Sequence, residues 1–224
     1  MQNIIREADK IKSEIKGFLK AKKKVFLTSS FQTHSIPLLH LISSLDVDIY
    51  FINTGFHFVE THIFKNKISQ MLNIKVESVE SPISKLNQKD KNGFFYYTSN
   101  PNNCCHLNKV LPTDKLLNSY DVWISGVRRD QNAFRKELNK IENTPNGKMR
   151  YHPVLDWNSK MIYQYRKEYN LPEHPLEKQG YYSIGCQPCT VNIKNMADDK
   201  DRNGRWDGQN KTECGLHTNL IKKQ

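Results

Sequence analysis

The alternation of short apolar runs with helical patterns over residues 24–126 constrains the fold more than any other feature of the sequence. Apolar runs of strand length occupy 24–30, 47–53, 74–80 and 121–126. Between them, 35–45, 57–72 and most of 104–120 repeat apolar residues at helical spacing. Strands that alternate with helices at this rhythm form a mostly parallel sheet with helices on both faces. We therefore predict an α/β fold.

The rest of the chain predicts smaller elements around this sheet. Residues 1–20 form an amphipathic helix with an apolar stripe, which we expect to pack on the sheet rather than to join subunits. Residues 142–157 predict a loop or hairpin, and 158–170 a helix capped by Asn158 or Ser159. We divide the chain into an α/β domain over 1–195 and a polar, flexible tail over 196–224.

Three loops follow strands of the predicted sheet and contain groups that can bind an anion. They are SSFQTHS at 29–35, NTGFHF at 53–58 and SGVRRDQ at 125–131. Parallel sheets bind ligands beyond the carboxyl ends of their strands, so the loops can converge on one crevice. The first loop contains no glycine, and we expect Gln32, Thr33 and His34 to contact a ligand through their side chains.

Four of the five cysteines form two close pairs, which suggests a metal centre. Cys104 and Cys105 are adjacent, and Cys186 and Cys189 form a CxxC motif. Neighbouring cysteines resist a mutual disulfide, and a CxxC spacing lets both thiolates reach one centre. A zinc site, a redox dithiol and a four-iron cluster are all open. Adjacent ligands reach different irons of a cluster more easily than one zinc ion, which favours a [4Fe–4S] cluster.

Cys214 stands apart in the polar segment KTECGLH. A core role is not expected for it there. Lys211 and His217 flank it and could lower its pKa, which would make it a nucleophile.

The overall composition narrows the partners and the compartment. A formal net charge of +11 attracts polyanions, which include nucleotides, nucleic acid and acidic proteins. No apolar run is long enough to span a membrane, and the amino-terminal helix lacks the apolar centre of a signal peptide. We expect a cytoplasmic protein, in which structural disulfides are disfavoured.

Several motifs in this order resemble the assimilatory sulfonucleotide reductases, the adenylyl-sulfate and phosphoadenylyl-sulfate reductases. They are NTGFHFVET, CCHLNKVLP, WISGVRRDQN, YSIGCQPCT, GRW and KTECGLH. The resemblance implies a fold like that of the adenine-nucleotide α-hydrolases, with a mobile carboxyl-terminal tail. It also implies attack by a tail cysteine on activated sulfate, an S-sulfocysteine intermediate, and release of sulfite by thioredoxin or glutaredoxin.

The resemblance assigns roles to particular residues of this chain. It makes Cys214 the catalytic cysteine, with His217 orienting the substrate or the tail. Cys104, Cys105, Cys186 and Cys189 match the ligands of the iron–sulfur cluster. The matches to substrate-binding residues are Ser29, Ser30, Thr54, Gly55, Lys109, Arg128, Arg129, Arg202 and Arg205.

The four extra cysteines favour adenylyl sulfate over its 3′-phosphorylated form, because within the family they accompany enzymes that use adenylyl sulfate. Phosphoadenylyl sulfate, or both substrates, is the alternative. A more distant alternative is a sulfur-transfer enzyme that acts on tRNA, but its SGGKDS loop is absent here. We expect no nucleic-acid or membrane partner. The sequence does not decide whether the protein forms a homo-oligomer.

Overall fold

The computed structural model describes residues 2–193, 204–206, 211, 213–218 and 220. In this part of the chain a six-stranded sheet has the order β3-β2-β1-β4-β6-β5. The strands are β1 (Val25–Thr28), β2 (Asp48–Ile52), β3 (Val76–Val79), β4 (Val122–Ser125), β5 (Ile141–Asn143) and β6 (Met149–Tyr151). All neighbouring strands are parallel except β5, which runs antiparallel to β6. The predicted α/β class is confirmed, and residues 142–157 contain the expected hairpin.

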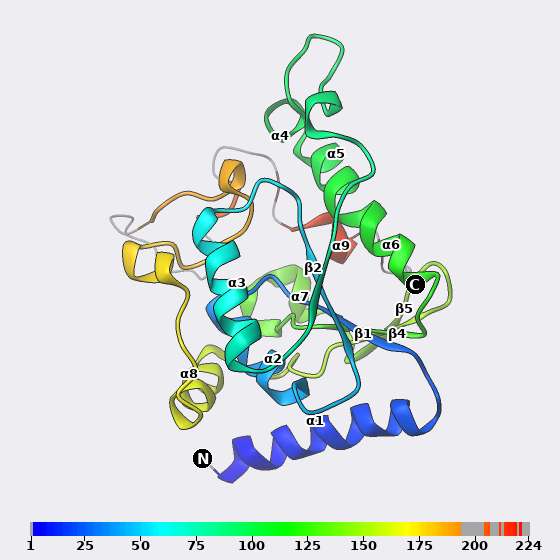
Figure 1. The fold of residues 1–224 in the computed structure, drawn as a ribbon, viewed down its shortest axis with the longest axis vertical. Helices are drawn as coiled ribbons and strands as arrows, with labels where there is room; N and C mark the ends of the chain where they lie inside the picture. The colour runs from blue at the N-terminus through cyan, green and yellow to red at the C-terminus, as the bar shows by residue number, and fades with distance from the viewer. Residues whose placement is uncertain (1, 194–203, 207–210, 212, 219, 221–224) are drawn as a thin grey trace.

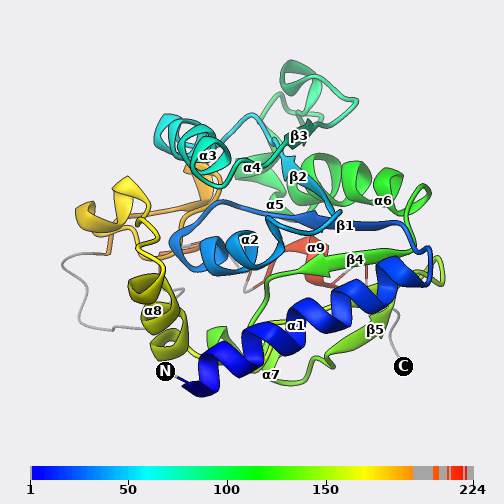
Figure 2. The same ribbon diagram turned by 60° about the horizontal axis from the view of Figure 1, so that its bottom comes forward.

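One face of the sheet holds the larger core and most of the helices (Figures 1 and 2). Val25, Leu27 and Ile49 alternate onto this face, as the two-residue period of a strand requires. The covering helices are α1 (Gln2–Lys20), α2 (Ile36–Ile42), α3 (Val59–Met71) and α8 (Ser159–Glu168). The stripe of α1 is buried at Ile4, Ala8, Ile11 and Ile15, so this helix packs on the body as predicted.

The opposite face carries the helical stretch that contains the first cysteine pair. Phe26 and Trp123 point to this side, and their aromatic rings stack at 6.2 Å between centroids. The stretch consists of α5 (Pro101–Cys105), a π-helical turn over His106–Val110 and α6 (Leu111–Leu117). Its residues Val110 and Leu117 pack against the two rings. The short α9 (Gly215–Thr218) lies on the same side, because Leu216 contacts this cluster.

Short elements connect these layers. α4 (Tyr96–Ser99) precedes α5, and α7 (Ala133–Lys136) follows β4. The cap of α8 is Asn158, whose side chain accepts a hydrogen bond from the amide of Met161. Of the two caps that the sequence left open, the structure selects this one, and the local bond explains why.

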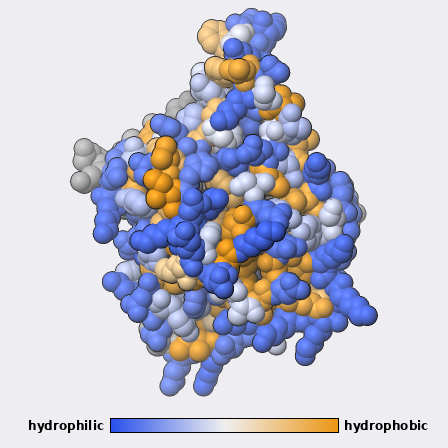
Figure 3. All heavy atoms as spheres, in the orientation of Figure 1, coloured by the Kyte–Doolittle hydropathy of each residue, from blue (hydrophilic) through white to orange (hydrophobic). Residues whose placement is uncertain are grey.

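The molecular surface is mostly hydrophilic, with apolar atoms at a few places (Figure 3). The segment between β3 and α4 protrudes at the top of this view, and its side chains Leu86 and Phe94 are exposed. Among the described residues, helices long and apolar enough for a membrane span are absent.

Candidate active site and cysteine cavity

A polar cavity of about 170 Å³ opens where β1, β2 and β4 end. The loops after β1 and β4 contribute Ser29, Ser30 and Gly126 to its lining. The carboxyl-terminal segment contributes Arg205, Cys214 and His217, and the π-helical turn contributes Lys109. Residues that lie far apart in the sequence therefore meet at the edge where open parallel sheets bind ligands. We call this cavity the anion pocket.

The glycine-free loop of the anion pocket turns at a phenylalanine. Phe31 has a φ of 53°, in the left-handed region that favours glycine. Its ring is fully buried and packs edge-on against Phe51, with 5.9 Å between the centroids, and this burial offsets a backbone strain of about 1 kcal/mol. Gln32 and His34 line the pocket, and their contacts with a ligand stay a prediction. Thr33 instead turns away and bonds to Glu177.

The four paired cysteines line a second, smaller cavity behind the anion pocket. Cys104, Cys105, Cys186 and Cys189 are all buried, and none of them forms a disulfide. Phe56, Tyr97 and Pro188 give this cavity an apolar wall. We call it the cysteine cavity.

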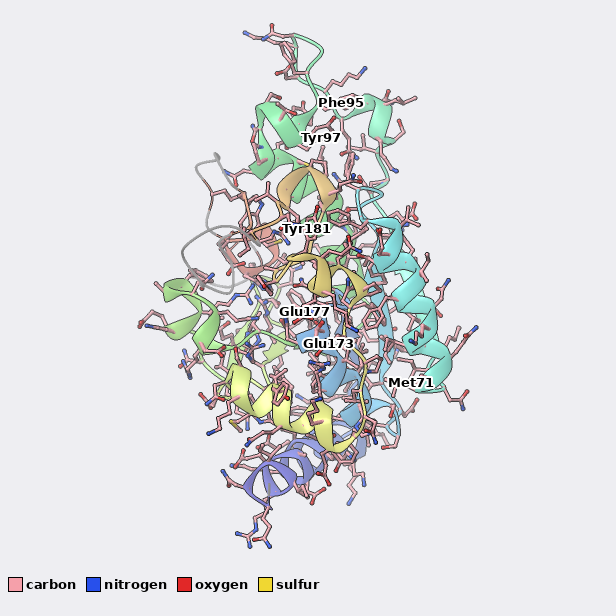
Figure 4. All side chains as sticks on the ribbon, turned by 90° about the vertical axis from the view of Figure 1, so that its left-hand side faces the viewer. Met71, Phe95, Tyr97, Glu173, Glu177 and Tyr181 are labelled. Carbon is pink, nitrogen blue, oxygen red and sulfur yellow. The ribbon has the colours of Figure 1, made fainter. Side chains whose placement is uncertain are left out.

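Local structure brings the two cysteine pairs together from distant parts of the chain. Asn100 caps α5 by accepting the amide of Asn103, which fixes the turn that presents the first pair. The segment that follows α8 carries the second pair, and it runs past Glu173, Glu177 and Tyr181 toward α4 (Figure 4). A β-bridge between His57 and Cys186 attaches it to the loop after β2. The hydroxyl of Thr54 lies 3.2 Å from Sγ of Cys186.

Lys109 lines both cavities and is half-buried between them. Burial works against its charge, yet the thiols of Cys186, Cys214 and Cys105 raise the pKa of Lys109 above its usual range. The ammonium is thus a permanent cation between the thiols and the anion pocket.

Cys214 is held in the anion pocket by the residue that precedes it. The carboxylate of Glu213 forms an ion pair with Arg135 at 2.7 Å, and both side chains are buried. Glu213 also accepts hydrogen bonds from Asn132, at 2.8 Å, and from the amide of Cys214, at 2.8 Å. The sequence did not predict that Glu213 and Cys214 are buried, because nothing in the polar tail indicates that Glu213 pairs with Arg135.

The thiol of Cys214 is hydrogen-bonded to the thiol of Cys105. This bond and burial raise the pKa of Cys214, so the lowered pKa predicted from its sequence neighbours is wrong for this structure. The same bond and Lys109 lower the pKa of Cys105 to about 6. The cation that favours the Cys214 thiolate here is Lys109. Lys211, which was expected to act on Cys214, donates instead to the side chain of Asn102 at 2.9 Å.

Arg205 reaches the anion pocket because its segment pairs with the CxxC motif. Arg205 forms a β-bridge with Thr190, and the amide of Trp206 donates to the carbonyl of Cys189 at 3.1 Å. The guanidinium lies over Gly185, where any Cβ would overlap it. Within the described residues its Nε is buried without a hydrogen-bond partner. A buried donor of this kind favours an anionic ligand.

His217 contacts a second buried arginine. Nη2 of Arg150 lies against Nδ1 of His217, and Nη1 donates to the carbonyl of Leu216 at 3.2 Å. Arg150 is fully buried on β6, with its guanidinium 4.2 Å from the ring centroid of Trp123.

Four predicted substrate-binding residues are not in the lining of the anion pocket. Arg128 pairs with Asp130 at 3.0 Å, and Arg129 pairs with Asp156 at 2.7 Å, so both hold loops together. Thr54 lines the cysteine cavity, and the carbonyl of Gly55 accepts a hydrogen bond from Lys85. Their contacts with substrate, and those of Ser29 and Ser30, stay predictions. Arg202 lies outside the described residues.

The donor set of the cysteine cavity fits an iron–sulfur cluster by its chemistry. Its four buried thiols match the four thiolate ligands that a [4Fe–4S] cluster takes. In the described part of the chain, groups of three or more His, Cys, Asp or Glu close enough for a single metal ion are absent. The cluster stays a prediction.

Sequence reasoning missed Arg135, Arg150, His57 and Glu213 as neighbours of the pocket. Burial and then Lys109 lower the pKa of His57 to about 3, so this imidazole is neutral at physiological pH. The arginines are single basic residues in a lysine-rich chain, so composition alone cannot select them. Arg150 stands opposite Trp123 in the register of β4 and β6, a pairing that the sequence alone does not show.

The chain matches a known protein family and several of its members in sequence. The phosphoadenosine phosphosulfate reductase domain matches residues 24–192. An adenosine 5′-phosphosulfate reductase of Bacillus cytotoxicus is 34% identical over 198 residues, which cover 87% of this chain and 84% of that protein. A phosphoadenosine 5′-phosphosulfate reductase of Gloeobacter violaceus is 35% identical over 200 residues, covering 87% and 82%.

Solved structures share the fold at low sequence identity. A phosphoadenylyl-sulfate reductase of Candida auris, in a phosphate complex, superposes with a TM-score of 0.68 at 21% identity, covering 85% of this chain and 97% of that one. An FMN adenylyltransferase of Candida glabrata has a TM-score of 0.62 at 15% identity, covering 99% and 78%. The matched domain and the relatives together show that this chain belongs to the phosphoadenosine phosphosulfate reductase family.

Proposed function

We propose that the protein reduces adenylyl sulfate to sulfite and AMP, with Cys214 as the nucleophile. The observation that carries this proposal is the convergence of one thiol and several cations on a single pocket. Cys214, Lys109 and Arg205 line the anion pocket at the carboxyl edge of the sheet. A soft thiolate suits the electrophilic sulfur of an activated sulfate, and cations suit the phosphate that leaves.

In the first step the Cys214 thiol loses its proton to solvent, beside the cation Lys109 that favours the thiolate, and Sγ then attacks the sulfate sulfur. A sulfur–sulfur bond forms, the bond between that sulfur and the phosphate oxygen breaks, and AMP departs with the electron pair. Cys214 then carries an S-sulfonate. Lys109 and Arg205 stabilise the charge that develops on the leaving phosphate. His217, which lines the same pocket, orients the sulfate.

In the second step a dithiol reductant of the thioredoxin or glutaredoxin class attacks Sγ of Cys214. Sulfite leaves, a mixed disulfide forms, and the second thiol of the reductant restores the Cys214 thiol. The two electrons that convert sulfate to sulfite come from this dithiol. Such reductants belong to the cytoplasm, where we place the enzyme.

Cys104, Cys105, Cys186 and Cys189 would hold a [4Fe–4S] cluster in the cysteine cavity. When bound, the cluster supplies a fixed charge distribution and joins two distant segments. Lys109, which lines both cavities, is the residue of this chain that connects the charge at the thiols with the charge of the substrate.

Phosphoadenylyl sulfate is the alternative substrate. It is favoured by the relative from Gloeobacter violaceus, which carries the name of that activity at 35% identity. Adenylyl sulfate is favoured by relatives such as that of Bacillus cytotoxicus and by the four cysteines lining one cavity.

Competing turnover separates these substrates. The protein is purified without oxygen, its iron and sulfide are counted, and sulfite release from each nucleotide is measured with thioredoxin as reductant. We expect about four irons and four sulfides per chain and a higher kcat/KM for adenylyl sulfate. A preference for the 3′-phosphorylated nucleotide would reassign the substrate, and sulfite from neither would refute the reductase activity.

A further inference from the structure

Arg150 is the least exposed cation of the pocket region, and none of the ion pairs among the described residues includes it. It extends from β6, beside Trp123 of β4, toward the carboxyl edge of the sheet. Burial lowers the pKa of Arg150 to about 9, so the guanidinium is still protonated at neutral pH. Glu142 favours the charge of Arg150, but it is bonded to His152 rather than paired with the guanidinium. A buried cation that is not directly paired with a carboxylate is costly, which points to a role beyond stabilising the fold.

The two terminal nitrogens of Arg150 touch three groups around the anion pocket. Nη1 donates to the carbonyl of Leu216 at 3.2 Å, and Nη2 donates to the hydroxyl of Ser125 at 3.3 Å. Nη2 also contacts Nδ1 of His217. Ser125 and His217 both line the pocket, so Arg150 lies directly behind its wall.

The contact with His217 has a chemical consequence. A guanidinium has five N–H donors and no acceptor. Nδ1 of His217 must therefore accept, which leaves that nitrogen without a proton. In a neutral imidazole the proton then resides on Nε2. A second proton on the ring would bring an N–H and a positive charge against the guanidinium, so this contact also selects the neutral ring.

We propose that Arg150 is a positioning residue that holds His217 as the neutral Nε2–H tautomer, so that His217 meets the sulfated nucleotide as a hydrogen-bond donor. The inference rests on the proposed function, because it is the bound sulfate that gives this donor its use. The bond from Arg150 to the carbonyl of Leu216 fixes the turn of α9 that carries the imidazole. One side chain thus sets both the place of the ring and the nitrogen that carries its proton.

A bound sulfate would also favour the charge of the buried guanidinium. Ser125 lies between Arg150 and the pocket, and a bound phosphosulfate would bring negative charge to the side of the pocket that Arg150 supports. Three charged groups of the fold act on Arg150. Glu142 favours its charge, Arg135 opposes it, and Glu213 favours it but is already paired with Arg135. An anion in the pocket would add a further counter-charge to that of Glu142.

The direct test is the nitrogen spectrum of His217 in the anaerobic holoenzyme labelled with ¹⁵N-histidine. His217→Gln identifies the signal by its loss. We expect an unprotonated Nδ1 and a protonated Nε2 in the natural protein, and a mixture of tautomers in Arg150→Met. An Nδ1–H tautomer or an imidazolium in the natural protein would overturn the proposal. This readout needs no turnover, so it stands even if neither nucleotide is reduced, the result that would refute the proposed function.

A kinetic cycle tests whether Arg150 acts through His217. We expect Arg150→Met to lower kcat/KM by about 100-fold, the loss typical of one misplaced donor at a reacting anion. In a His217→Gln background the same change should cost less than about threefold, because the two residues act as a unit. Arg150→Lys, which keeps a donor, should recover about tenfold of the loss. Equal losses in both backgrounds would show that Arg150 serves the fold alone.

Arg166→Met is the matched control, because Arg166 is also buried and its Nη2 also donates to a backbone carbonyl, that of Leu171. It should lower stability without changing the His217 tautomer. If Arg150→Met does not fold, the natural protein and Arg150→Lys still decide the proposal through the nitrogen spectrum.

Discussion

The anion pocket and the cysteine cavity share a lysine but are built in opposite ways. The cysteine cavity is formed by thiols on elements of the body, α5 and the turn over Gln187–Cys189, against an apolar wall. The anion pocket is formed by strand ends of the body and is completed by Arg205, Cys214 and His217 from the carboxyl-terminal segment. The thiols that would bind metal thus belong to elements of the body, whereas Cys214, the proposed nucleophile, belongs to a separate carboxyl-terminal segment.

This difference suits the two purposes that we propose for the five cysteines. Metal-ligating thiols would gain from a fixed framework, and a nucleophile would have to meet both a nucleotide and a reductant. Lys109 lines both cavities. A hydrogen bond also connects Cys105 of the cysteine cavity with Cys214 of the anion pocket.

The largest effect is expected from removing the nucleophile. Cys214→Ser should lower sulfite formation by about 10⁴-fold or more, because a serine hydroxyl is a poor nucleophile for sulfate sulfur. Nucleotide affinity, iron content and the visible absorbance of the cluster should be unchanged. Sulfite release near the natural rate would show that another group attacks.

The second prediction removes a thiol from the cysteine cavity. Cys189→Ser should reduce the iron content from about four to near zero and lower the thermal midpoint, because four-iron clusters need four ligands. Iron and sulfide counts and an unfolding curve measure this. Retained iron with unchanged absorbance would remove Cys189 from the ligand set.

Lys109 should affect the function of both cavities. Lys109→Met removes the cation between the thiols and the anion, and we expect kcat/KM to fall by about 100-fold. Lys109→Arg should recover part of this loss. The matched control is Lys115→Met, on the exposed side of α6, which should leave turnover unchanged. Equal kinetics for the two methionine variants would contradict the shared role.

A smaller effect is expected from loosening the tail. Glu213→Gln leaves Arg135 buried without its counter-ion and weakens the bond to the Cys214 amide. We expect faster hydrogen exchange at that amide and a loss in kcat/KM of about tenfold, the order of one charge-assisted hydrogen bond. Unchanged exchange would mean that other contacts hold Cys214.

The last prediction concerns folding stability rather than turnover, and it depends on His152, whose ring nitrogen Nδ1 lies 3.4 Å from the carbonyl oxygen of Ser125. Burial lowers the pKa of His152 from 6.5 to about 4, although Glu142 works against this. Between these values the unfolded chain binds a proton that the folded chain does not, so stability falls as the pH falls. From pH 7 to 5 we expect a loss of about 2 kcal/mol in the free energy of unfolding, measured in urea. His152→Gln should show a weaker pH dependence, and an equal dependence would exclude His152 as the cause.

The sequence was sufficient for the sheet and for the grouping of the cysteines. Apolar runs such as 121–126 have the length and composition of buried strands, and the structure forms strands there. Ser29 and Ser30 lie at the end of the first run, so the sequence also predicted that they lie at the carboxyl edge of the sheet, where the pocket opens. The two cysteine pairs indicated a common centre because their spacing is local. In each case the information lies within a few residues of the chain.

The rest could not be predicted because it depends on contacts between distant segments. Arg135 meets Glu213 and Arg150 meets His217 across more than sixty residues, and no local pattern marks either pair. Likewise Arg128 and Arg129 matched substrate-binding residues by motif, yet here they pair with Asp130 and Asp156. A tail of polar composition gave no sign that Cys214 would be buried.

The most direct test of the account is to trap the intermediate. The anaerobic protein is mixed with adenylyl sulfate without a reductant, digested and analysed by mass spectrometry. We predict one added SO₃ group on the peptide that contains Cys214, none on the peptides of the four paired cysteines, and its loss as sulfite when thioredoxin is added. An SO₃ group on any other cysteine, or on none, would contradict the account.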